Sequence, residues 1–340
     1  MDGISELRQN PATREWVIIS TDRAKRPEEF GEGSTVITNE SQLTCPFCPG
    51  REQNTPSEIV AYRPEGSSPN APNWWIRVIP NMYPAVSPKG ELDRKKVDKI
   101  FIKMDGVGEH EVIIETPDHF NIIPKMTVKQ VEEIFLVYRE RYLELAKNPR
   151  NESVIIFKNY GKNAGTSIIH SHSQIISTPI MPLHLRQKIE EAMRFFDDHG
   201  DCVYCNIIKE EAALKERVVF ETENFIVLEP FAARTPFETW ILPKKHESSF
   251  GSTGIESCKE LAKAMQIILK KLHKSLNNPD YNYVIFSSPC HESELEYFHW
   301  HLKIYPRLAQ MAGFELGSGI YINSVPPENA TKYLKQTVVD

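Results

Sequence analysis

Two pairs of cysteines constrain this 340-residue chain more than any other feature. Cys45 and Cys48 form one Cys-x-x-Cys pair, and Cys202 and Cys205 form the other. In a chain of this length, such pairs are more often metal ligands or redox motifs than structural disulfides. Prolines and a glycine flank the first pair in "LTCPFCPGRE", which favours a metal-binding knuckle over the strand-to-helix setting of a redox motif.

Each cysteine pair opens the same series of features. A strand-like run ending at a histidine, an amphipathic helical stretch, a second strand and a His-x-His motif follow in that order. Periodic apolar residues predict helices over 127–148 and 256–278, and β-branched and aromatic runs predict strands over 153–161 and 281–289. The matching order predicts an internal duplication of an α+β unit. A further helical stretch over 183–200 would join the halves, so we expect domains at residues 1–182 and 183–340.

The repeated ligand order predicts two structural zinc sites, because zinc is commonly held by two cysteines and two histidines. The first half offers Cys45, Cys48, His119 and either His170 or His172, and the second offers Cys202, Cys205, His246 and either His299 or His301. Taken alone, His119 could cap a turn and His246 could be a solvated surface residue. A zinc ribbon would place its ligands within a few tens of residues, whereas these are spread over each half.

One histidine of "HSHSQ" remains after a zinc site is filled. Residues i and i+2 of a strand share a face, so His170, His172 and Gln174 would form one row. The spare histidine could be a hydrogen-bonded core residue, but its surroundings are typical of a phosphate site. They include hydroxyls, glycines, amides and positive charge, from Lys158, Asn159, Gly161, Lys162, Asn163, Gly165, Thr166, Ser167, Ser171 and Ser173.

This pattern favours nucleophilic chemistry at phosphorus. A neutral imidazole can attack phosphorus and form a phosphoramidate, provided that its other N–H is held, ideally by a backbone carbonyl. Gln174 could donate to a phosphoryl oxygen, and Ser173 could place a hydroxyl beside it. Arg23 and Arg26 suit bidentate phosphate contact, although a solvated charged turn explains them equally well.

Composition excludes several other classes. The net charge is -6 and the chain has no long Lys/Arg run, so we expect no nucleic-acid partner. No run approaches the roughly 20 apolar residues that span a bilayer, and the start of the chain lacks the pattern of a secretory signal. We therefore expect a cytoplasmic protein that acts on small molecules.

Motifs along nearly the whole chain resemble those of galactose-1-phosphate uridylyltransferases, a branch of the histidine-triad superfamily. They are "NPATREWVIISTDRAKRP", "CPFCPGRE", "RVIPNMYPAV", "ETPDH", "FKNYGKNAGTSIIHSHSQI" and "FHWHLKIYPRL". The second Cys pair, His-Ser-His-Ser-Gln and "GFELGSGIYINSVPPE" are most similar to the plant-type branch that acts as an ADP-glucose phosphorylase.

The resemblance implies tandem histidine-triad domains of class α+β, each an antiparallel sheet with helices, and a homodimer. It implies that His172 is the nucleophile and His170 the zinc ligand, with His299 completing the second of two zinc sites. It also implies nucleotide or phosphate contacts at Arg23, Arg26, Asn81, Asn159, Gly165, Ser167 and Gln174, with Phe314 and Gly317 reaching the partner subunit's ligand.

The resemblance further implies ping-pong transfer of a nucleoside monophosphate through a nucleotidyl-histidine. The first expectation is a UDP-glucose–hexose-1-phosphate uridylyltransferase of galactose metabolism, and the alternative is an ADP-sugar phosphorylase that uses orthophosphate. Serines replace the proline and glycine of the usual His-Pro-His-Gly-Gln motif, which leaves the acceptor open. A nucleotide hydrolase and a zinc-stabilised binding module are further alternatives.

Overall fold

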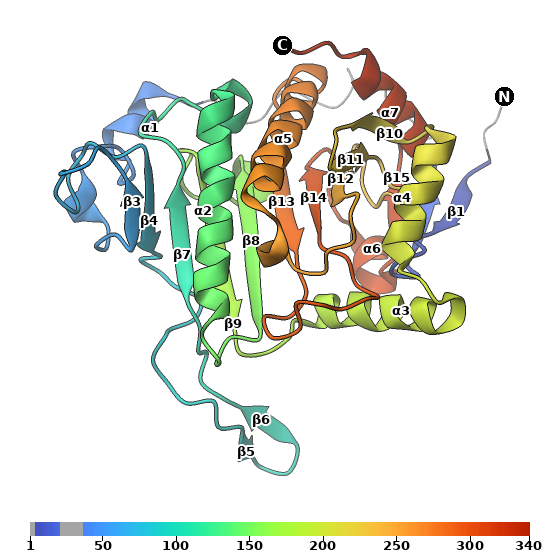
Figure 1. Cartoon of the computed structure of the whole chain (residues 1–340), viewed down its shortest axis with the longest axis horizontal. Helices are drawn as coiled ribbons and strands as arrows, with labels where there is room; N and C mark the ends of the chain where they lie inside the picture. The colour runs from blue at the N-terminus through green and yellow to red at the C-terminus, as the bar shows by residue number, and fades with distance from the viewer. Residues whose placement is uncertain (1–3, 21–36) are drawn as a thin grey trace.

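One ten-stranded sheet organises the computed structural model, which describes residues 4–20 and 37–340 (Figure 1). Every neighbouring pair within it is antiparallel. In spatial order the strands are β10 (Val218–Glu221), β11 (Phe225–Leu228), β12 (Thr239–Pro243), β14 (His301–Pro306), β13 (Tyr281–Phe286), β8 (Ser153–Tyr160), β9 (His172–Thr178), β7 (His110–Ile114), β4 (Ile76–Pro80) and β3 (Val60–Tyr62).

The order of these strands is symmetric about the pair β8–β13. Reading outwards from that pair, β8, β9, β7, β4 and β3 correspond to β13, β14, β12, β11 and β10. The α+β class and the tandem histidine-triad fold are therefore confirmed. The two half-sheets also join edge to edge, with Tyr281 opposite Tyr160 and Ile285 opposite Ile156. The boundary between residues 182 and 183 lies between β9 and α3 (Leu183–His199) and stays a prediction.

Two long helices cover one face of the sheet, one from each half (Figure 1). They are α2 (Val128–Ala146) and α5 (Ile255–Ser275), close to the two stretches predicted from periodicity. Thr127 begins α2 with a capping box that it shares with Gln130. Ile134, Phe135 and Tyr138 of α2 are fully buried against the sheet, and residues of α5 join the same core.

The opposite face is covered differently in the two halves. In the second half, alternate residues of β11 and β12 pack against α3 and α4 (Val203–Leu214), which gives a second core. In the first half, most residues of β8 and β9 on this face stay half-buried, including Ile155, Asn159 and Gln174. This stretch of sheet is where the candidate site lies, and we call the face opposite α2 and α5 the open face.

Smaller elements complete the described residues. A three-stranded sheet contains β1 (Glu6–Gln9), β2 (Trp16–Ile19) and β15 (Tyr321–Asn323), and β5 (Lys95–Val97) pairs with β6 (Phe101–Lys103) in a projecting ribbon (Figure 1). The remaining helices are α1 (Asn39–Leu43), α6 (Gly313–Ser318) and α7 (Pro327–Gln336). Among the described residues, no helix combines the length and the apolar character needed to cross a membrane.

Candidate active site

Four residues from distant parts of the first half meet at one point. The ligand atoms of Cys45, Cys48, His119 and His170 all lie within 4.8 Å of one another, and all four residues are buried. The Cys48 sulfur lies 3.4 Å from His119 Nδ1 and 3.6 Å from His170 Nδ1, and the Cys45 sulfur also lies 3.6 Å from His170 Nδ1. We call these four residues the first cluster.

The second half repeats this arrangement with Cys202, Cys205, His246 and His299, again within 4.8 Å of one another. The Cys205 sulfur lies 3.4 Å from His246 Nδ1 and 3.7 Å from His299 Nδ1. We call these residues the second cluster. The sequence-based choice of His170 and His299 over His172 and His301 agrees with the members of both clusters.

The spacing in both clusters fits a tetrahedral metal. Zn–S bonds of about 2.3 Å and Zn–N bonds of about 2.0 Å at a tetrahedral angle place sulfur and nitrogen about 3.5 Å apart. The far ring nitrogens are also held, as is usual for histidine ligands. His170 Nε2 donates to the carbonyl of Thr116 at 2.7 Å, and His299 Nε2 donates to that of Pro243 at 2.9 Å. Both clusters can therefore hold zinc with each Nδ1 facing the metal.

His172 begins β9, whereas His170 lies in the bend before it. The expected single row of His170, His172 and Gln174 is therefore wrong at its first member, because the chain turns between the two histidines. The turn lets His170 reach the cysteines while His172 and Gln174 share the open face. Phe47, from between the two cysteines, packs edge-on against the His172 ring at 5.3 Å between centroids.

The His172 ring presents one free nitrogen. Nδ1–H donates to the carbonyl of His170 at 2.8 Å, and no hydrogen bond of the described residues engages Nε2. Burial, with a further contribution from Lys158, lowers the pKa of His172 to about 4. The imidazole is therefore neutral at physiological pH, with the lone pair of Nε2 available. This is the tautomer that attack on phosphorus requires.

Two neighbours orient the Gln174 amide. The backbone N–H of Ala85 donates to His110 Nδ1 at 3.1 Å, so His110 carries its proton on Nε2 and donates to Gln174 Oε1 at 2.7 Å. Asn81 Nδ2 donates to the same oxygen at 3.4 Å. With its oxygen held twice, Gln174 directs its NH₂ group away from His110. His110 belongs to none of the sequence motifs described above, and only the pairing of β7 with β9 reveals its contact with Gln174.

Asn159 supplies a second amide on the open face. The register that pairs Phe157 with Gln174 brings Asn159 opposite His172 two residues further along. Asn282 Nδ2 donates to Asn159 Oδ1 at 2.7 Å, which leaves the Asn159 NH₂ group as a donor. His172, Gln174 and Asn159 thus combine one nucleophilic nitrogen with two N–H donors on adjacent strands.

The loop between β8 and β9 closes one end of this group. Gly161 has φ 88°, and a Cβ added there would lie 1.8 Å from a carboxylate oxygen of Asp280, so only glycine fits. Gly165 has φ 86°, in the left-handed region. Gly165 and Ser167 are exposed in the loop that leads directly to the two histidines.

A buried polar network lies behind the site, on the side of α2. The Lys158 ammonium pairs with Glu115 and donates to the carbonyl of His172 at 2.9 Å. The Ser171 hydroxyl donates to Glu115 at 2.6 Å. Burial alone would raise the pKa of Glu115, but the Lys158 ammonium holds it below its usual range. Lys158 was expected beside the phosphate, and this is wrong because alternation along β8 directs it to the helix side.

The same alternation corrects the expectation for Ser173. It is fully buried and shares the helix-facing side of β9 with Ile175, whereas His172 and Gln174 face the other way. Its hydroxyl therefore lies behind the sheet rather than beside a phosphate on the open face.

The remaining four predicted contacts form two groups. Arg23 and Arg26 fall outside the described residues. Phe314 and Gly317 are exposed on α6, in the second half of the chain. No contact of the described residues joins these two to His172, so within one chain the structure does not bring them to the site.

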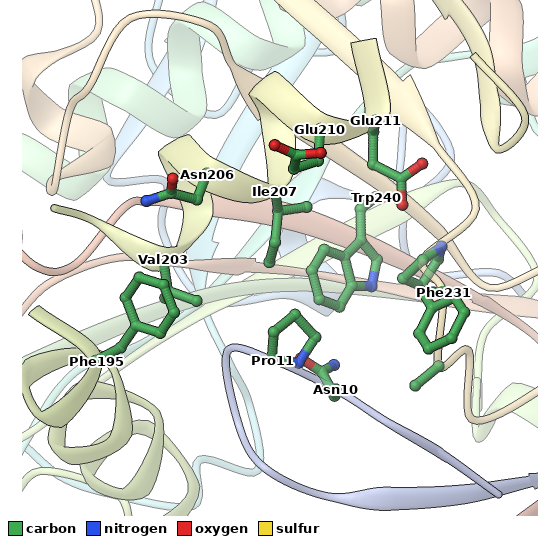
Figure 2. A pocket seen from close by; sticks show the side chains of 12 residues that line it. Asn10, Pro11, Phe195, Val203, Asn206, Ile207, Glu210, Glu211, Phe231 and Trp240 are labelled. Atoms are coloured by element: carbon green, nitrogen blue, oxygen red, sulfur yellow. The ribbon is translucent and has the colours of Figure 1, made fainter. Parts of the chain in front are cut away.

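A separate apolar cavity of about 220 Å³ lies in the second half between α3, α4 and the segment after β1. Figure 2 shows Phe195, Val203, Ile207 and Trp240 around it. None of the predicted site residues lines this cavity. Its walls also lack the cluster of N–H donors found around His172, so it does not serve as the nucleotidyl site.

Comparison with known proteins agrees with the geometry. Residues 1–182 match the family model "Galactose-1-phosphate uridyl transferase, N-terminal domain", and residues 188–318 match the model of its C-terminal domain. An ADP-glucose phosphorylase from Arabidopsis thaliana is 37% identical over 97% of this chain and 92% of its own. A galactose-1-phosphate uridylyltransferase from Thermotoga maritima is 31% identical over 98% of this chain and 99% of its own.

Solved structures extend the likeness to three dimensions. The crystal structure of an ADP-glucose phosphorylase from Arabidopsis thaliana with bound ADP-glucose superposes with a TM-score of 0.83. It is 35% identical and covers 99% of this chain and 100% of its own. The chain belongs to the galactose-1-phosphate uridyl transferase family and is an enzyme of the nucleotidyltransferase class.

Proposed function

We propose, from this family membership, that the protein is an ADP-sugar phosphorylase: it transfers an adenylyl group from an ADP-sugar to orthophosphate through a covalent nucleotidyl-His172. The supporting observation is the 37% identity to an ADP-glucose phosphorylase over almost the whole chain. The rival is a hexose-1-phosphate uridylyltransferase that uses UDP-glucose, because 31% identity links the chain to such an enzyme.

The proposed reaction takes place in two displacements. His172 Nε2 attacks the α-phosphorus, the N–P bond forms, and the bond to the bridging oxygen breaks, which releases the sugar 1-phosphate. An oxygen of orthophosphate then attacks the same phosphorus, the N–P bond breaks, and ADP leaves. The bond from Nδ1 to the His170 carbonyl stabilises the ring when phosphorus is attached to Nε2.

Gln174 and Asn159 act on the charge that shifts to the phosphoryl oxygens. Their NH₂ groups are already oriented by His110 and Asn282, so little reorganisation is needed when the transition state forms. Removing one such donor typically lowers turnover about 10²- to 10³-fold.

The first and second clusters would each hold one zinc ion with a structural role. Four protein ligands fill a tetrahedral ion, which leaves no position for substrate. The first cluster would hold His170, and therefore the start of β9, against the Cys45–Cys48 loop. Phe47 in that loop contacts the His172 ring, so the cluster fixes the nucleophile without taking part in the chemistry.

A homodimer would complete the site. Phe314 is 49% exposed on α6, so its ring is available for contact outside its own chain. In the proposed dimer, Phe314 and Gly317 reach the nucleotide sugar bound by the other subunit. An equal mixture of His172→Asn and Gly317→Trp chains, re-associated at random, should recover up to about a quarter of activity when each mutant alone is inactive, because half of the dimers are mixed and each has one intact site. No recovery in a proven mixed dimer would refute this sharing.

One assay decides between the two acceptors. The enzyme is incubated with ADP-glucose or UDP-glucose, each with orthophosphate, glucose 1-phosphate or galactose 1-phosphate, and the products are separated by anion-exchange chromatography. The proposal predicts ADP from ADP-glucose and orthophosphate at least about tenfold faster than any UDP-glucose reaction. Preference for UDP-glucose with galactose 1-phosphate would favour the rival, and free AMP without an acceptor would indicate a hydrolase.

The covalent step is tested separately. Protein mixed with ADP-glucose alone and denatured in alkali should gain the mass of one adenylyl group, and acid should remove it. Peptide mapping should place the adduct on His172. His172→Asn protein should show no adduct, and an unchanged adduct in that variant would exclude the mechanism.

A further inference from the structure

A second cavity lies on the open face in the other half of the sheet, with a volume of about 400 Å³. Four of its lining residues are basic: His184, Lys188, Arg234 and Arg307. Within residues 4–20 and 37–340, no aspartate or glutamate lines it. Phe286, Tyr305 and Tyr321 contribute aromatic walls. We call this space the basic cavity.

Two buried lysines meet beside the basic cavity, and Lys188 is the one that lines it. Lys188 of α3 is 5% exposed and Lys303 of β14 is 3% exposed. Their amino groups hydrogen-bond to each other, and the Lys303 Nζ lies 3.6 Å from the centre of the Trp240 ring. No carboxylate of the described residues forms an ion pair with either lysine. Buried ammonium groups without a paired anion are costly, so this pair favours binding of an anion.

The nearest carboxylates are already engaged. Glu15 pairs with Arg234 and accepts from the Thr13 hydroxyl. Glu238 accepts from the Trp240 indole N–H at 2.8 Å and from the backbone N–H of Arg234 at 2.7 Å. One of two amines that hydrogen-bond to each other must be neutral, because an ammonium group has no acceptor. The lysine pair therefore carries one positive charge, and with Arg234 and Arg307 three positive charges face two carboxylates. A bound phosphate group would compensate this excess.

The duplication gives this location a counterpart in the first half. His301 lies opposite Phe286, as His172 lies opposite Asn159, and Lys303 occupies the position of Gln174. His301 Nδ1 even repeats the bond to the carbonyl two residues earlier, at 2.9 Å. The basic cavity thus lies where a phosphate would bind if the second half worked like the first.

The second half lacks a reachable nucleophile. His301 is fully buried, and its Nε2 has no hydrogen-bond partner among the residues that the structure describes. Phe286 stacks on the His301 ring at 5.2 Å between centroids, and Tyr204 stacks on it at 4.8 Å. An anion in the cavity would therefore be bound but not attacked.

The Lys188 end of the cavity lies away from His172. Arg307, at the other end, donates to Asn282, whose amide holds Asn159 of the catalytic site. Lys188 instead lies over the Phe286 ring, with its amino group 4.9 Å from the ring centre. The register of β13 with β8 puts Phe286 four residues from the level of Asn159, which is about 13 Å at about 3.3 Å per residue. One orthophosphate cannot span that distance.

We propose that the basic cavity is a second, non-catalytic binding site for a small phosphate-bearing anion, held at the end where Lys188 lies. The aromatic walls leave room for a sugar or base attached to that phosphate. This proposal concerns binding alone, so it holds whether the acceptor at His172 is orthophosphate or a hexose 1-phosphate.

Equilibrium binding tests the proposal in the His172→Asn protein, which cannot form the adduct. Orthophosphate, glucose 1-phosphate and AMP are titrated separately by calorimetry at constant ionic strength. Lys188→Met should weaken the tightest of the three at least about tenfold. Lys209→Met is the matched control, because Lys209 is exposed on the neighbouring α4, and it should change nothing. Equal affinity in the Lys188 and Lys209 variants would overturn the proposal.

A labelling experiment needs no variant. Burial lowers the pKa of Lys188 to about 8, so its amine is partly neutral and can form an imine. Pyridoxal 5′-phosphate followed by borohydride should label Lys188 or Lys303, and orthophosphate should reduce this labelling at least about fivefold. Pyridoxal, which lacks the phosphate, should label them much less. Equal labelling by both aldehydes, or no protection, would refute an anion site.

Discussion

His172 and His301 occupy the same place in two copies of one fold, and only one of them is accessible. Both donate Nδ1–H to the carbonyl two residues earlier, at 2.8 Å and 2.9 Å. Phe47 meets the His172 ring edge-on, whereas Tyr204, at the same place in the second Cys-x-x-Cys pair and in the first turn of α4, stacks over the His301 ring. Holding a histidine in the correct tautomer is therefore not enough, because substrate must also reach Nε2.

The two halves also differ in the residues near each His-x-His motif that face α2 and α5. Lys158 and Ser171 of the first half belong to the buried network with Glu115, while Ile285 and Trp300 take the equivalent positions in the second half. The second half thus stabilises its motif with apolar packing, and the first half uses charge. The first arrangement costs desolvation, but it anchors the His172 carbonyl through Lys158.

The largest expected difference between the halves concerns the nucleophile. His172→Asn should lower exchange of label between ADP-glucose and glucose 1-phosphate by roughly 10⁴-fold or more, because no other group can take its place. His301→Phe should leave the exchange rate within about threefold of wild type, because the ring at this position is stacked between Tyr204 and Phe286 and takes no part in the reaction. Mass spectrometry should find one adduct per wild-type chain, and two would show that His301 also reacts.

The next largest expected effect is on the free energy of unfolding, and it comes from the buried network of Lys158 and Glu115. Lys158→Met leaves the buried Glu115 carboxylate unpaired and should lower the free energy of unfolding by about 3 to 5 kcal/mol. The double substitution Lys158→Ile with Glu115→Leu removes both charges, as in the second half, and should recover at least half of that loss. Urea unfolding followed by circular dichroism measures both. A double variant no more stable than the single one would contradict this comparison.

The two clusters should differ in what they support. Cys48→Ser and Cys205→Ser should each reduce bound zinc, measured by atomic absorption, from two ions per chain towards one. Loss of the first ion should lower kcat about 10- to 100-fold, because Phe47 and His170 position His172. Loss of the second should lower Tm while kcat at 25 °C stays within about threefold. Equal effects on kcat would show that the second cluster also supports the catalytic site.

The smallest effect concerns His110, which we regard as a positioning residue. His110→Phe frees Gln174 Oε1 and should lower kcat about tenfold with little change in KM, because the amide then samples both orientations. His110→Gln keeps an N–H donor and should restore most of the rate. In the Gln174→Ala background, His110→Phe should have no further effect. A full additive loss there would assign His110 a different role.

Much of this architecture could be predicted from the sequence. Ligand order predicted three members of each cluster, and the family resemblance supplied His170 and His299 as the fourth. Periodicity predicted α2, α5 and the strands that flank them. The predictions for Lys158 and Ser173 were wrong for the same reason. The sequence shows which residues are near a motif, but not which face of a strand each residue occupies. The role of His110 depends on the pairing of β7 with β9, which links residues more than 60 positions apart. The continuous sheet was also beyond prediction, because nothing in either half specifies its edge partner.

The pairing of β8 with β13 covers the edge strand of each half with a strand of the other half. A fragment ending at residue 182 would leave β8 as an open edge strand, prone to pairing with further chains. It would also lose Asn282, so the Asn159 amide would be free to flip. Solubility and amide orientation in the first half thus depend on a neighbour that performs no chemistry. Heat should therefore unfold the two halves in one calorimetric transition rather than two.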